Sequence, residues 1–164
     1  MQTKELEKQF ERLINDNQLL LYKVCRVYAF SADDRKDLFQ DIVIQLWKSF
    51  PKYRAEAKFS TWMYRVAINT SISRIRKEKN FIHSYQLNEL PTQLQDKDDA
   101  VEREEQFATL YAAIDQLNEI EKAIIMLYLE DKTYEEMEEI MGMNQGNLRV
   151  KMTRIKEKLR QLTK

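Results

Sequence analysis

Residues 133–159 read TYEEMEEIMGMNQGNLRVKMTRIKEKL, and their spacing predicts two helices joined by a tight turn. Thr133 followed three residues later by Glu136 is a capping box, which opens a short helix that Gly142 ends. A longer helix starts near Gln145. Its apolar residues recur at steps of four and three, at Leu148, Met152, Ile155, Leu159 and Leu162. This pattern is typical of a helix-turn-helix unit, whose second helix can enter the major groove of DNA.

The opposite face of that second helix carries amide and cationic side chains. Residues 142–164 hold seven basic side chains and one acidic side chain. The duplex-facing candidates are Asn147, Lys151, Arg154 and Lys158, with further positive charge from Arg149. Its first turns would meet base edges and its later cations would meet phosphates. The alternative is a solvated basic face on a terminal helix packed on the core.

Working outward, two more helices precede this pair, one with apolar residues from Phe107 to Leu117 and one beginning near Asn118. Before them the helical pattern is lost over residues 80–101, where Pro91 and a cluster of aspartates indicate a flexible acidic linker. Residues 81–120 carry two basic and nine acidic side chains. We expect a second unit of four helices after the linker.

The first 80 residues also predict four helices. Two span about residues 4–28 with a break at residues 15–17, and a third begins after Ser31 and ends at Pro51. A short loop leads to a fourth helix over about residues 60–79. The chain is therefore expected to be all-α, with two small helical domains.

The composition of the 164 residues excludes several other classes of protein. Two glycines cannot supply hairpin turns or a phosphate-binding loop. One Cys and one His cannot form a disulfide framework or a zinc site, and the longest apolar run is far shorter than the roughly 20 residues that span a bilayer. With His83 in the linker and Cys25 on a helix as a structural thiol, we expect no enzyme, no cofactor, no metal and no membrane insertion.

The fourth helix carries one stripe with groups that suit unpaired nucleotides. Its members, at steps of three, four, four and three, are Trp62, Arg65, Asn69, Ser73 and Arg76. Aromatic rings stack on exposed bases, amides bond base edges, and guanidiniums hold the backbone. The preceding loop adds Lys52, Tyr53, Arg54, Lys58 and Phe59. The alternative is that Phe59 and Trp62 are ordinary core and the rest is helix surface.

The third helix has a polar side away from its apolar stripe. This side carries Asp37, Gln40, Asp41, Gln45 and Lys48, with Trp47 at its border. It is either exposed helix surface or a protein docking surface with Trp47 as an anchor.

Three motifs together resemble the bacterial sigma-70 family, in its extracytoplasmic-function (ECF) group. They are DLFQD at 37–41 leading to Trp47, FSTWMYRVAIN at 59–69, and YEEMEEIMG at 134–142 before a basic helix. The resemblance implies a region 2 domain over residues 1–80, a linker over 81–102 and a region 4 helix-turn-helix domain over 103–164.

The resemblance implies a cytoplasmic sigma factor that binds RNA polymerase core and promoter DNA, with an anti-sigma factor as a further partner. The clamp helices of the largest subunit would dock on Asp37, Gln40, Asp41, Gln45 and Trp47, and the flap of the second subunit would hold region 4. The loop before Trp62 and the helix with Asn69 would capture the minus-ten element as single strand around a flipped base. The last helix, Gln145 to Lys158, would read the minus-thirty-five duplex. A helix-turn-helix regulator without polymerase docking and a helical adaptor without a DNA role are the alternatives.

One position departs from the family pattern. Glu138 stands where the turn motif usually has a small Ala that faces the second helix. A bulkier charged residue there would widen the crossing of the two helices or expose Glu138 at their edge. Gly146 also falls in the first turn of the second helix, where it weakens the helix start by up to about 1 kcal/mol.

Overall fold

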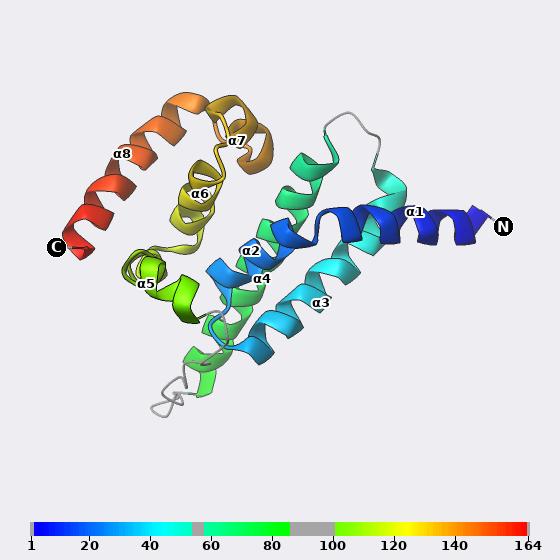
Figure 1. Cartoon of the computed structure of the whole chain (residues 1–164), viewed down its shortest axis with the longest axis horizontal. Coiled ribbons are helices and arrows are strands. Elements are labelled where there is room, and N and C mark those ends of the chain that lie inside the picture. The colour runs from blue at the N-terminus through cyan, green and yellow to red at the C-terminus, as the bar shows by residue number, and fades with distance from the viewer. Residues whose placement is uncertain (1, 54–57, 86–100, 164) are drawn as a thin grey trace.

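The computed structural model describes residues 2–53, 58–85 and 101–163, and within these ranges it is helical without strands (Figure 1). The fold confirms the all-α prediction. The elements are α1 (Gln2–Asp16), α2 (Gln18–Tyr28), α3 (Ala32–Ser49), the 3-10 turn η1 (Phe50–Lys52), α4 (Phe59–Tyr85), α5 (Val101–Asp115), α6 (Glu119–Leu129), α7 (Tyr134–Met141) and α8 (Gln145–Leu162).

Helices α1–α4 form the first unit, in which α2, α3 and α4 pack against one another. Ser31 caps α3 by accepting a hydrogen bond from the backbone N–H of Asp34 at 3.0 Å. The centre of this unit is filled by side chains that are almost wholly buried: Leu21, Leu38, Ile42, Leu46 and Met63. Helix α4 continues to Tyr85, beyond the expected end at Lys79, because no proline or glycine interrupts the chain there.

Helices α5–α8 form the second unit, and side-chain caps define where they begin. Asn118 and Glu121 form a capping box at α6, and Thr133 and Glu136 form the expected one at α7. Gly142 ends α7 in the left-handed conformation at φ +70°, as its position in the motif predicts. The core of this unit consists of Ile114, Ile124, Leu127, Met137, Leu148, Met152 and Ile155.

The two units pack directly against each other. Helices α2 and α4 of the first lie against helices of the second (Figure 1), with contacts from α2 to α5 and α6 and from α4 to α6 and α7. The buried side chains of both units form one continuous cluster. The Tyr28 hydroxyl donates a hydrogen bond to the Glu119 carbonyl at 2.6 Å, and Lys23 pairs with Glu130 at 2.9 Å. The predicted linker spans residues 81–102, but residues 81–85, with His83, belong to α4 and residues 101–102 to α5. Residues 86–100 lie outside the described residues.

Candidate nucleic-acid interface

The stripe predicted on α4 lies at the surface of the first unit. Arg65, Asn69, Ser73 and Arg76 are exposed, and Trp62 is half-buried. The opposite sides of α4 are buried, including Met63 and Ala67, which accounts for the regular separation of polar and apolar positions. Arg65 already has a partner, because its guanidinium donates a hydrogen bond to the backbone carbonyl of Glu139 in α7.

Trp62 belongs to an aromatic cluster at the start of α4. Its ring centroid lies 5.0 Å from that of Tyr53, 5.3 Å from that of Phe59 and 6.2 Å from that of Phe50. Phe50 is buried, whereas Tyr53, Phe59 and Trp62 are each half-buried. These rings therefore pack on one another at the start of α4 and also keep part of their surface exposed.

The cations predicted beside this cluster are only partly placed. Lys52 follows α3 in the 3-10 turn and is exposed, and Lys58 is exposed directly before α4. Arg54, the third predicted cation, lies outside the described residues.

A groove of about 660 Å³ runs between α3 and α4. Asp41 and Gln45 of α3 line one side of it, and Asn69 and Ser73 of α4 line the other. The fold thus brings two of the predicted docking residues next to two of the predicted nucleotide-binding residues. Their separation in the sequence gave no sign that they share one surface.

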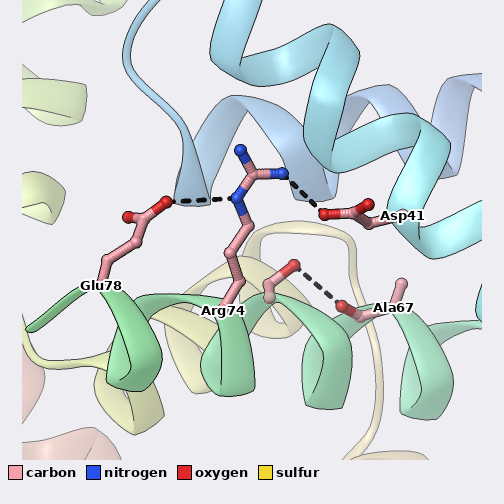
Figure 2. Close-up of polar contacts among 5 residues, drawn as sticks. Asp41, Ala67, Arg74 and Glu78 are labelled. Carbon is pink, nitrogen blue, oxygen red and sulfur yellow. Dashed lines mark hydrogen bonds and ion pairs between the residues drawn. The ribbon is translucent and has the colours of Figure 1, made fainter. Parts of the chain in front are cut away.

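Arg74 stands in this groove and was not predicted as a functional residue. Its guanidinium lies 2.9 Å from a carboxylate oxygen of Asp41 and 3.3 Å from one of Glu78 (Figure 2). The i,i+4 pair with Glu78 is visible in the sequence, but the pair with Asp41 joins residues 33 positions apart. Arg74 therefore holds a docking candidate of α3 against α4, in a polar surface that water reaches.

The predicted docking face of α3 is exposed at Asp37, Gln40, Asp41 and Gln45. Trp47 is 37% exposed and packs its ring 5.1 Å from that of Phe10 in α1. An aromatic side chain held by a neighbouring helix with a third of its surface free has the form of an interface anchor. Docking at these residues stays a prediction.

The basic face of α8 is also at the surface. Asn147, Arg149, Arg154 and Lys158 are exposed, and Lys151 and Gln145 are half-buried. The helix begins where Asn144 accepts a hydrogen bond from the Asn147 backbone N–H at 2.7 Å, so its first turn is fixed. Lys158 lies 2.7 Å from Glu121 of α6, which ties the far end of this face to the neighbouring helix.

Glu138 turns its carboxylate toward α8. It is half-buried and accepts a hydrogen bond from the side-chain amide of Gln145 at 3.0 Å. The position therefore faces the second helix, as in the family pattern, but it makes a polar contact where Ala would make an apolar one.

Several titrating groups in the described residues have displaced pKa values, and three of them, Cys25, Tyr64 and Glu121, lie at contacts described above or used below. Burial raises the pKa of Cys25 to about 11 in spite of Arg35 and Arg74, so the thiol stays protonated at neutral pH, which suits a structural role. Burial, with Glu130 nearby, raises the pKa of Tyr64 to about 12. Burial alone would raise the pKa of Glu121, but hydrogen bonds from Lys158 and Asn118 lower it below its ordinary value.

Within residues 2–53, 58–85 and 101–163, no three His, Cys, Asp or Glu side chains are grouped so that they could hold a metal ion. The helices in these ranges include none with the length and apolar character of a membrane span.

Comparison with known proteins identifies the class. Residues 13–81 match the model of sigma-70 region 2, and residues 107–159 match the model of sigma-70 region 4. The chain therefore belongs to the sigma-70 family, in its ECF group, and is an RNA polymerase sigma factor. Sigma factors as a class act by binding rather than as enzymes.

Individual relatives span nearly the whole chain. It is 28% identical over 153 residues to RNA polymerase sigma factor SigV of Bacillus subtilis, covering 92% of this chain and 89% of the relative. It is 27% identical over 162 residues to the ECF sigma-E factor of Haemophilus influenzae, covering 92% and 85%. The sigma factor RpoE of Bartonella quintana, solved with the anti-sigma factor NepR, has the same fold with a TM-score of 0.75 at 16% identity, over 94% of this chain and 96% of that one.

Proposed function

We propose that residues 1–80 dock on core polymerase and capture the minus-ten element as single strand, and that residues 103–164 read the minus-thirty-five element as duplex. Residues 81–102 connect them. The observation that carries this assignment is the groove between α3 and α4, where Asp41 and Gln45 face Asn69 and Ser73. A protein that docks on polymerase and holds a melted strand beside it needs these two surfaces to be adjacent.

The chemistry of this function is differential binding. Unstacking a base costs a few kcal/mol, and stacking and hydrogen bonds available only to the open strand offset that cost. The half-buried rings of Phe59 and Trp62 supply stacking surface, and Asn69 supplies an amide for a base edge. Arg65, Arg76, Lys52 and Lys58 hold phosphates, so affinity falls as salt rises.

Partners are assigned to faces by their chemistry. The acidic and amide face of α3 receives the clamp helices of the largest polymerase subunit, with Trp47 as the anchor. The flap of the second subunit holds the second unit. An anti-sigma factor is a further partner, in keeping with the solved complex of Bartonella RpoE with NepR. These partners place the protein in the cytoplasm, with the transcription machinery.

Reconstituted transcription tests the proposal. The purified chain is mixed with core polymerase and genomic DNA from its own source, and transcript starts are mapped. We expect association with core and initiation at a defined set of sites that share two upstream elements. A chain that shifts duplex DNA but neither binds core nor directs initiation would instead be a helix-turn-helix regulator, and the proposal would be wrong.

A further inference from the structure

Two side-chain contacts join the helices of the turn motif, and both reach the start of α8. The guanidinium carbon of Arg149 lies 5.0 Å from the ring centroid of Tyr134, and the amide of Gln145 donates to the carboxylate of Glu138 at 3.0 Å. Tyr134 and Glu138 are four residues apart on α7, and Gln145 and Arg149 are four apart on α8. Each pair therefore occupies one helix face, and the two contacts are adjacent.

We propose that Glu138 and Tyr134 are positioning residues that determine the base preference of α8, Glu138 through Gln145 and Tyr134 through Arg149. The proposal rests on the proposed function, in which α8 reads the minus-thirty-five duplex. Neither α7 residue needs to touch DNA.

The carboxylate of Glu138 fixes which way the Gln145 amide faces. A carboxylate only accepts hydrogen bonds, so the NH₂ group of Gln145 must point toward it and the carbonyl oxygen must point away. An unheld glutamine can rotate its amide by half a turn, because the two ends have nearly the same shape. Glu138 removes that freedom.

A held amide favours some bases over others. In the major groove, adenine and cytosine present exocyclic amino groups, whereas guanine and thymine present carbonyl acceptors at the corresponding edge. The free carbonyl oxygen of Gln145 accepts from an amino group and repels a carbonyl. Because Gln145 is the first residue of α8, where recognition helices meet base edges, this selects adenine or cytosine on the strand that Gln145 contacts at one promoter position.

Tyr134 acts on Arg149 by a related constraint. A guanidinium over an aromatic face is attracted to it, and the contact limits the directions in which the long side chain can extend. Arg149 is exposed, so the ring of Tyr134 restrains a side chain that water would otherwise leave mobile. The aromatic ring, rather than the hydroxyl, supplies this restraint.

The test uses the complete holoenzyme on a promoter library. The minus-thirty-five bases upstream of a mapped start are randomised, and the templates that yield transcripts are sequenced. The position read by Gln145 is the one whose base preference Gln145→Ala abolishes. There we expect the wild type to favour adenine or cytosine by about tenfold.

Glu138→Gln is the diagnostic variant. It keeps the size of the side chain but can accept or donate, so Gln145 adopts both orientations. We expect the preference at that position to fall to near equality while the other positions keep theirs. Glu135→Gln, at an exposed position of the same helix, removes the same charge and leaves the profile unchanged.

A double variant separates positioning from a general effect of charge or folding. Adding Glu138→Gln to Gln145→Ala should change the profile no further. Three results would overturn the role of Glu138. They are a further change of base preference when Glu138→Gln is added to Gln145→Ala, an unaltered base preference in Glu138→Gln alone, and an equal change in Glu135→Gln. If the wild-type holoenzyme selects no start site at all, the proposed function fails instead.

The role of Tyr134 has its own conservative variant. Tyr134→Phe keeps the ring and should keep the wild-type profile, whereas Tyr134→Leu should weaken the preference at the position that Arg149→Ala abolishes. Equal profiles for Tyr134→Leu and the wild type would overturn this part. Thermal unfolding followed by circular dichroism checks that each variant is folded.

Discussion

Gly142 and Gly146 lie on either side of the turn between α7 and α8, and they place opposite demands on the backbone. Gly142 has φ +70°, and a Cβ there would have no neighbour within 4 Å, so its requirement for glycine is conformational rather than steric. Gly146 is helical, and a Cβ there would lie 3.5 Å from Oδ1 of Asn144, an ordinary contact distance.

Alanine at these two positions should therefore have effects of opposite sign. We expect Gly142→Ala to lower the free energy of unfolding by about 1–2 kcal/mol, the cost of left-handed backbone for an L-residue. We expect Gly146→Ala to raise it by about 0.5–1 kcal/mol through helix propensity. Urea denaturation of the wild type and the two variants measures both changes in the free energy of unfolding. A loss of stability in Gly146→Ala would show that the first turn of α8 needs glycine for another reason.

Asn69 and Asp41 share a groove, yet the proposed function gives them different tasks. Asn69→Ala should impair open-complex formation and leave core binding unchanged, because the lost amide contacts only the melted strand. Asp41→Asn should weaken core binding instead. Permanganate reactivity of unpaired thymines measures opening, and co-purification measures docking. Loss of core binding in Asn69→Ala would assign the α4 side of the groove to polymerase.

At the scale of elements, Glu121 joins the start of α6 to the last helix. Its carboxylate accepts from the Asn118 backbone N–H at 3.1 Å, completing the capping box, and lies 2.7 Å from Lys158 of α8. These bonds lower the pKa of Glu121 in the folded state although burial opposes them. A lowered carboxylate pKa means that the ionised form stabilises the fold, and that this contribution is complete above the unfolded value and disappears as the pH falls through the folded one.

Glu121→Gln should therefore lose stability in a pH-dependent way. Glutamine can still complete the capping box but carries no charge. We expect the difference in unfolding free energy between wild type and variant to be largest at neutral pH and to shrink below about pH 4. Urea titrations across that range measure it. A difference that stays constant down to about pH 3 would mean that the charge of Glu121 contributes nothing.

How far the sequence could predict these elements depends on the separation of the interacting residues. The helix pair from Tyr134 to Leu162 follows from Thr133, Gly142 and a regular apolar spacing, all of which act locally. The pairs Arg74–Asp41 and Lys158–Glu121 join residues 33 and 37 positions apart, so only the packed fold brings them together. The sequence marks Glu138 as a departure from the family pattern, but its contact with Gln145 follows only from the geometry of the turn.

At the scale of the whole molecule, the two units are less separate than the linker composition indicates. The buried side chains of α2, α4, α6 and α7 form one cluster, and polar contacts at Tyr28, Lys23 and Arg65 cross the boundary. Periodicity predicted which residues each helix buries but not which helices they pack against. Tyr64 of α4, for example, lies against Lys132 of the second unit. Arg65 is both a candidate for DNA binding and a contact between the units, through the hydrogen bond from its guanidinium to the Glu139 carbonyl.

The shared core should make the two units unfold together, and the chain provides a selective probe. Both tryptophans, Trp47 and Trp62, lie in the first unit, so their fluorescence reports that unit, whereas far-UV circular dichroism reports all helices. Leu127→Ala removes a fully buried side chain from α6 in the second unit. We expect this variant to lower the unfolding midpoint followed by fluorescence and the one followed by dichroism equally. The shift should correspond to a loss of about 2–5 kcal/mol in the free energy of unfolding.

Leu46→Ala, in the first unit, is the matched control because Leu46 is equally buried and should shift both signals in the same way. If Leu127→Ala moves the dichroism transition and leaves tryptophan fluorescence unchanged, the units unfold independently and the contacts at Tyr28, Lys23 and Arg65 do not couple them. Coincident transitions would instead mean that the free energy of separating the units contributes to the stability of each. Any partner that opens the molecule must then supply that free energy through the contacts it makes in return.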